Sequence, residues 1–172
     1  MWSMKDVAEL LNRLLAEGVI TDYAVFGAVA QMRYTEAVVT MDADILVAVP
    51  DPKAIDLLRP IYAFCGARGY QPEGDAIRVG DWPVQFIPAF SPLSEAAMRH
   101  AEIAEIEGVP LRVVRADYLA VIALSVGRAK DLARILALLE AGAVTPAAIE
   151  RLAEEHGLSD KWRQFRRRFD EA

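Results

Sequence analysis

Two carboxylates stand close together at the start of a strongly apolar segment. Asp42 and Asp44 lead directly into ILVAV, residues 45–49, and this nearly continuous apolar, β-branched run predicts a buried central strand. Side chains at positions i and i+2 of a strand point to the same side, so the two carboxylates would lie together. Such a pair repels unless a cation lies between its members, and Mg²⁺ binds carboxylates together with substrate phosphates. The pair therefore predicts a magnesium site that can neutralise a triphosphate during phosphoryl transfer.

A glycine precedes this pair along the chain. Gly27 ends the β-rich run DYAVFG, residues 22–27, and residues 28–34 are expected to form a brief helix. A residue without Cβ lets the backbone approach a phosphate closely, and amides at the start of a helix can donate to it. Acidic residues also flank strands simply because strand ends are solvated, so Asp-x-Asp alone leaves a structural role open.

Length and composition place limits on the class of protein. The chain has 172 residues, a formal net charge of −6 and one cysteine, which indicates about one folded domain without an intramolecular disulfide. The negative charge argues against a protein that coats nucleic acid non-specifically. The N-terminal 15 residues have the pattern of an amphipathic helix and not of a signal peptide, and the apolar stretch 119–127 is too short to span a bilayer. We therefore expect a soluble, cytoplasmic protein with no membrane contact.

The elements around the acidic pair alternate between helical and strand patterns. The order predicts an α+β fold, a mixed β-sheet flanked by helices with a helical C-terminal part, divided into a core of residues 1–115 and a helical subdomain of residues 116–172. The expected helices are 4–15, 28–34, 53–68, 91–101, a long one at 116–141, one from 145 and one through 161–169. The expected strands are 22–27, 43–49, 76–80, 83–89 and a pair at 104–108 and 110–114 that turns at residues 108–110.

The order of these motifs resembles the signature of the nucleotidyltransferase superfamily. That signature is Gly-Gly or Gly-Ser opening a short helix, followed by Asp-x-Asp on the next strand, and it matches GA at 27–28 and TMDAD at 40–44. GAVAQMRYTEAVVTMDADILV is similar to the bacterial branch that contains minimal nucleotidyltransferases and AbiE-type toxin components. GRAKDLARILALLEAG, residues 127–142, is similar to the helix that these proteins carry after the sheet. The resemblance covers about residues 22–142.

The resemblance implies roles for individual residues. Asp42 and Asp44 would bind Mg²⁺ and act in catalysis, and Lys130 would approach the nucleotide phosphates or the acceptor. The alternative for Lys130 is a solvated helix face on which Asp131 and Arg134 form an i, i+3 pair. The nucleotide and its metal would be held by four further residues: Gly27, Ala28, Thr40 and Gln85.

Gln85 departs from the superfamily pattern. Active members carry a third carboxylate on a later strand, and in this sequence the matching position holds Gln85. Glutamine can offer a carbonyl oxygen to a metal, but it carries no negative charge and cannot act as a general base. Glu36 and Asp81 are other candidates for completing the metal site. Two functions stay open: transfer of a nucleoside monophosphate from an NTP to a hydroxyl, or a degraded nucleotide-binding or protein-binding module, such as a toxin–antitoxin component.

The acceptor and the partners follow less directly from the residues. The resemblance allows a protein, a tRNA or a small molecule such as an aminoglycoside as the acceptor, and a toxin–antitoxin partner or a homodimer as the assembly. The basic segment KWRQFRRRF, residues 161–169, can hold RNA through its arginines. The alternative is a solvated helix end, docked through Trp162, Phe165 and Phe169, whose cations favour the helix C-terminus.

Overall fold

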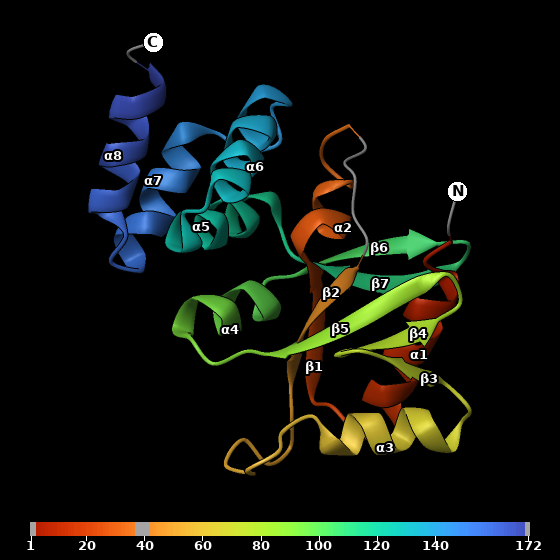
Figure 1. The fold of residues 1–172 in the computed structure, drawn as a ribbon. Helices are drawn as coiled ribbons and strands as arrows, with labels where there is room; N and C mark the ends of the chain where they lie inside the picture. Colours follow the sequence, from red (N-terminus) through yellow and green to blue (C-terminus); the bar gives the residue numbers. More distant parts are fainter. Residues whose placement is uncertain (1–2, 37–41, 171–172) are drawn as a thin grey trace.

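A seven-stranded mixed sheet forms the centre of the computed structural model, which describes residues 3–36 and 42–170 (Figure 1). Its strand order is β3-β4-β5-β2-β1-β7-β6. The central strand β2 runs antiparallel to β1 and parallel to β5, and β1 runs parallel to β7. The strands are β1 (Asp22–Phe26), β2 (Ala43–Ala48), β3 (Gln71–Glu73), β4 (Ala76–Val79), β5 (Trp82–Pro88), β6 (Glu102–Ile106) and β7 (Val109–Val113).

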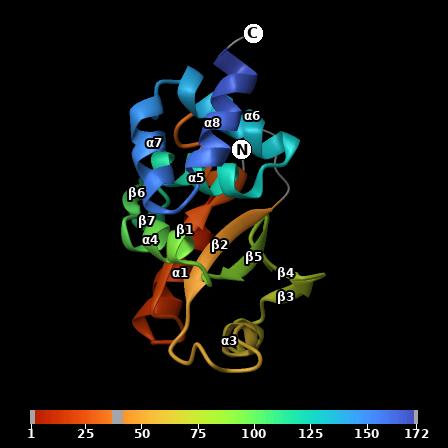
Figure 2. The ribbon, with the colours of Figure 1, turned by 90° about the vertical axis from the view of Figure 1, so that its left-hand side faces the viewer.

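Helices lie on this sheet and at the two ends of the molecule. The helices are α1 (Lys5–Ala16), α2 (Gly27–Gln31), α3 (Arg59–Ala67), α4 (Pro92–Arg99), α5 (Ala116–Val126), α6 (Ala129–Glu140), α7 (Pro146–Glu155) and α8 (Ser159–Asp170). Figures 1 and 2 show α5–α8 gathered at one end of the molecule, with α3 at the opposite end. Helix α1 packs on β1 and β7, α4 packs on β1 and β2, and α5 contacts α2 as well as α4, α6, α7 and α8. The observed architecture agrees with the predicted α+β fold and its helical C-terminal part.

The central strands are buried as the apolar runs predicted. Ile45, Leu46 and Val47 of β2 are at most 3% exposed, which is the burial expected when a strand is covered on both faces. Val25 of β1 and Leu119 of α5 belong to the same buried cluster. The division at residue 115 into two units stays a prediction, although α5 does begin at Ala116. Within residues 3–36 and 42–170, no helix has the length and apolar character needed to cross a membrane.

The single long helix predicted for residues 116–141 is wrong. The chain forms α5 and α6 instead, separated at Gly127, which has a φ of +74° and caps the C-terminus of α5. Glycine adopts this left-handed conformation without the steric penalty of a Cβ. Asp131 then accepts hydrogen bonds from the backbone and side chain of Arg128 and so caps the start of α6. The apolar periodicity continues across the break, which explains why the pattern alone predicted one helix.

Three smaller expectations also differ from the structure. Helix α3 begins only at Arg59, with Pro60 in its first turn, where the missing N–H of proline is tolerated; residues 53–58 form turns and bends. Strand β5 begins at Trp82, and the short exposed strand β3 was not predicted. The β6–β7 hairpin turns at Glu107 and Gly108, whose φ values of 50° and 84° suit a two-residue turn of the primed type, and not at residues 108–110.

Candidate functional site

The candidate site lies where β1 ends and β2 begins. Because these strands are antiparallel, the last residue of β1, Phe26, is in register with Asp44 near the start of β2. Gly27 therefore follows directly beside the Asp44 carboxylate. A Cβ placed on Gly27 would lie 2.7 Å from Asp44 Oδ2, and Gly27 has a φ of +68°. Both the close approach and the left-handed backbone require glycine at this position.

The surroundings of the Asp44 carboxyl disfavour its negative charge. Burial raises the pKa of the Asp44 carboxyl, and the negative charge of Asp42 raises it further. Arg134 and Lys130 act in the opposite direction and lower that pKa. Asp42 directly precedes β2 and is exposed to solvent. A hard cation with oxygen ligands would relieve the repulsion between the two carboxylates, so this pair has the donor chemistry that Mg²⁺ requires.

Gln85 occupies the position beside Asp44 on the neighbouring strand. The parallel register of β2 and β5 pairs Asp44 with Gln85, which is partly exposed. Residues paired in this way project from the same face of a sheet, so Gln85 stands on the Asp44 side of β5, at the position where the resemblance implies a third acidic residue. No group of three or more His, Cys, Asp or Glu side chains able to hold a metal occurs within residues 3–36 and 42–170. Neither Glu36 nor Asp81 therefore completes a three-carboxylate set in this structure.

Helix α6 brings positive charge to the same region. Lys130 and Arg134 are four residues apart, so they lie on neighbouring turns of one helix face, and both influence the pKa of Asp44. Lys130 is exposed and Arg134 is half-buried. The Nε of Arg134 donates to Gln31 Oε1 at 3.0 Å. The alternative for this helix face paired Asp131 with Arg134; Asp131 instead forms its ion pair with Arg128 at 2.7 Å, and Arg134 acts on it through its charge.

Gln31 and Arg134 were missed from the sequence as functional candidates. Gln31 is 5% exposed, and a buried polar residue closing the otherwise apolar helix GAVAQ is a signal that could have identified it. Of the other predicted site residues, Ala28 follows Gly27 in the first turn of α2. Thr40 lies outside the described residues, so its predicted role in binding the nucleotide stays a prediction.

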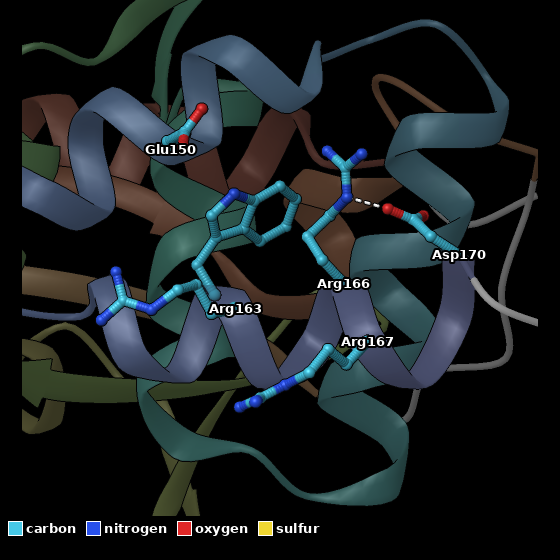
Figure 3. Close-up of a pocket in the computed structure, with 6 residues that line it drawn as sticks. Glu150, Arg163, Arg166, Arg167 and Asp170 are labelled. Carbon is cyan, nitrogen blue, oxygen red and sulfur yellow. Dashed lines mark hydrogen bonds and ion pairs between the residues drawn. The ribbon is translucent and has the colours of Figure 1, made fainter.

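The basic C-terminal helix lies apart from these residues. Trp162 and Phe165 of α8 are buried with stacked rings 5.4 Å apart, as the apolar stripe predicted. A hollow of about 470 Å³ lies beside Trp162, and Figure 3 shows the side chains that line it. Ion pairs with Asp160 and Asp170 engage two of its arginines. The hollow is lined by Glu150, Trp162, Arg163, Arg166, Arg167 and Asp170, none of which belongs to the site around Asp44.

Comparison with known proteins identifies the fold. Neither a protein-family model nor a curated protein sequence matches the chain. The crystal structure of an antigenic nucleotidyltransferase-like protein from Paracoccidioides brasiliensis superposes with a TM-score of 0.56 and 15% identity, over 94% of each chain. The solution structure of the antibiotic-resistance factor ANT(2'')-Ia superposes with a TM-score of 0.50 and 14% identity, over 98% of this chain and 99% of that one. Identities this low demonstrate a shared fold only, and that fold is of the nucleotidyltransferase type.

Proposed function

We propose that this protein is a Mg²⁺-dependent nucleotidyltransferase, which moves a nucleoside monophosphate from an NTP to a hydroxyl of an acceptor. The observation that carries the proposal is the contact between Gly27 and the Asp44 carboxylate. It brings the glycine-led turn and the acidic pair of the superfamily signature to one point. The nucleotidyltransferase-type fold supports the same conclusion.

Each residue of the site has a defined chemical role in this proposal. Asp42 and Asp44 would hold Mg²⁺, and Gln85 would offer a neutral amide oxygen beside them. Mg²⁺ would supply neutralisation of the phosphate charge that develops during transfer. Gly27 allows the backbone to approach the phosphates, and Lys130 balances their negative charge. In the reaction the acceptor oxygen bonds to the α-phosphorus, the bond to the β-phosphate breaks, and pyrophosphate leaves.

The transfer also requires a base that removes the proton of the acceptor hydroxyl. The neutral amide of Gln85 cannot take it, so we expect a slower transfer than a carboxylate at the same position would give. The acceptor belongs to one of the three classes predicted from the sequence: a protein, a tRNA or a small molecule such as an aminoglycoside.

A second candidate function follows from the same observation on Gln85. Because no third acidic side chain joins these two carboxylates in a cluster among the described residues, the site suits a protein that binds nucleotide, or a protein partner, without turnover. Such a protein could form one half of a toxin–antitoxin pair or a homodimer. Binding and transfer are separated by the experiment below.

Calorimetric titration of ATP and GTP, with and without Mg²⁺, tests the proposed site. We expect binding by the wild type that needs Mg²⁺ and is lost in Asp42→Asn/Asp44→Asn. The matched control is Asp51→Asn/Asp75→Asn, which removes the same charge from two exposed residues and should bind like the wild type. Incubation with labelled ATP and each acceptor class then measures transfer. No binding by the wild type at millimolar nucleotide would refute both functions that use a nucleotide, and binding without transfer would favour the second.

A further inference from the structure

We propose that a second copy of this chain docks at the end of the molecule that carries α3, with Ile55 of each copy inserted into an apolar groove of the other. This end lies away from Asp44, so the inference does not rest on the proposed function. It assigns a surface to the homodimer, one of the two assemblies that the family resemblance allows. That surface consists of the loop between β2 and α3 and the exposed side of α3.

An apolar groove lies at the α3 end of the molecule, opposite α5–α8 (Figure 1). Its volume is about 560 Å³, larger than that of the hollow beside Trp162. Residues that follow α1, residues that follow β2, the loop before α3 and α3 itself all contribute apolar side chains to its lining, among them Val19, Val49, Pro50, Leu57, Pro60 and Phe64. An exposed apolar surface with a polar rim is typical of a site that binds another molecule.

Ile55 stands beside this groove and does not fill it. Its exposure of 106% is the highest among the large apolar side chains that the structure describes. Its chain neighbours Ala54 and Asp56 both line the groove, whereas Ile55 is not part of the lining. The Ile55 side chain therefore points away from the groove of its own copy. A single exposed apolar residue is common on protein surfaces, but one that adjoins an apolar groove provides both halves of a contact.

A two-fold dimer uses both halves at once. In such an interface residue i contacts residue j, and j contacts i, so a projecting side chain and a groove on one surface suit a second copy of the same chain. Phe90, the next most exposed apolar side chain at 73%, leaves the sheet at this end, because the N–H of Ala89 donates to Val47 O close to the end of β2. The contact thus forms at an end of the sheet that is rich in exposed apolar side chains.

The charges around the groove are complementary in the same two-fold manner. The charged residues in its lining are all acidic: Glu17, Asp51 and Asp56. Arg68 pairs with Glu17, which leaves the two exposed aspartates of the loop. Lys53 and Arg59, on either side of Ile55, are exposed, and in the described part of the chain neither takes part in an ion pair. When Ile55 enters the groove of the partner, these cations meet aspartates of opposite charge.

This dimer leaves the candidate functional site accessible in both copies. Asp44 lies near the start of β2, and Pro50 of the groove follows the end of that strand. Six residues of extended chain span about 20 Å. Loss of the dimer should therefore leave nucleotide binding unchanged, which keeps this inference separate from the proposed function.

Sedimentation equilibrium of the whole chain, from micromolar to millimolar concentration, tests the proposal. We expect a wild-type dimer that Ile55→Ser weakens about 100-fold or more, because each dimer loses two buried isoleucines. Ala63→Arg adds a long side chain to the groove from an exposed position on α3, and it should weaken the dimer from the other side of the contact. Lys53→Glu should also weaken it, and should reduce its sensitivity to salt. The matched control is Ile103→Ser, which removes an isoleucine that is 67% exposed on β6 and should leave association unchanged.

A disulfide between copies locates the contact. A mixture of Ile55→Cys and Ala63→Cys chains should form it under mild oxidation, and a mixture of Ile103→Cys and Ala63→Cys chains should not. The native Cys65 is buried, and burial raises its pKa to about 11, so it stays unreactive.

Two results would overturn the proposal. The first is a wild type that stays monomeric at millimolar concentration, which would leave the groove to a different partner. The second is a dimer that both Ile55→Ser and Ala63→Arg leave unchanged, which would place the contact on another face. Misfolding does not confuse the result, because the fully exposed Ile55 side chain can be replaced without loss of packing in the folded monomer.

Discussion

The contact between Gly27 and Asp44 makes a quantitative prediction about Gly27→Ala. Gly27 has a φ of +68°, and an L-residue in the left-handed region costs about 1–2 kcal/mol. The new Cβ would also lie 2.7 Å from Asp44 Oδ2, and ordinary contacts begin at 3.4 Å. The carboxylate oxygen must therefore retreat by about 0.7 Å, which exceeds the roughly 0.2 Å tolerance of a metal–ligand distance. We expect Gly27→Ala to lose both stability and Mg²⁺-dependent nucleotide binding.

Gly142→Ala separates the two effects. Gly142 has nearly the same backbone conformation, with a φ of +71°, but a Cβ there meets no atom within 4 Å. Both variants should lower the free energy of unfolding in urea by about 1–2 kcal/mol. Calorimetric titration of ATP with Mg²⁺ should show wild-type affinity for Gly142→Ala and an affinity at least about tenfold weaker for Gly27→Ala.

Two results would refute this reasoning. Wild-type nucleotide affinity in Gly27→Ala would show that the close approach of Gly27 does not position the Asp44 carboxylate. An equal loss of affinity in both variants would assign the effect to global destabilisation, because only Gly27 contacts the acidic pair.

Two further predictions concern the cap of α6 and the missing carboxylate. Burial acts to raise the pKa of Asp131, but the hydrogen bonds from Arg128 outweigh it and lower the pKa below its usual 3.8. The stability that ionised Asp131 gives to the folded state is therefore complete above pH 3.8, and it is lost as the pH falls through the lowered pKa. Asp131→Ala should cost about 1–3 kcal/mol in urea unfolding at pH 7 and less at pH 3; an equal cost at both pH values would contradict this. Gln85→Asp places a carboxylate beside Asp44 and should raise the transfer rate about 100-fold, whereas Gln71→Asp, on exposed β3, should not; equal rates in the two variants would exclude position 85 as the site of the missing base.

Several local features could be predicted because they depend on neighbours in sequence. The apolar run after Asp44 predicted a buried strand, and the structure confirms it in β2. The stripe of Trp162, Phe165 and Phe169 predicted the docked face of α8, and the first two are buried. The order of Gly27 and the acidic pair predicted a candidate site, and the structure brings Gly27 and Asp44 together, while the roles of these residues stay predictions. These features follow from side-chain alternation and helical periodicity, which the chain carries locally.

Other features were missed because the apolar pattern along the chain does not report them. The break between α5 and α6 depends on the left-handed backbone of Gly127 and the cap formed by Asp131, both hidden by a continuous apolar period. The unexpected strand β3 has no buried residue, so it carries no apolar alternation that could have revealed it.

The sequence by itself identified the residues that are proposed to carry the chemistry, and the two-residue period of an extended backbone predicted that Asp42 and Asp44 point to the same side. In the structure Asp44 lies in β2 and Asp42 directly precedes it. Only the tertiary structure decided what surrounds them. The register of β2 and β5 places Gln85 beside Asp44, and the docking of α6 brings Arg134 to Gln31, 103 residues away in the chain. Such contacts come from the packing of whole elements against a common core, and no local pattern of residue types encodes them.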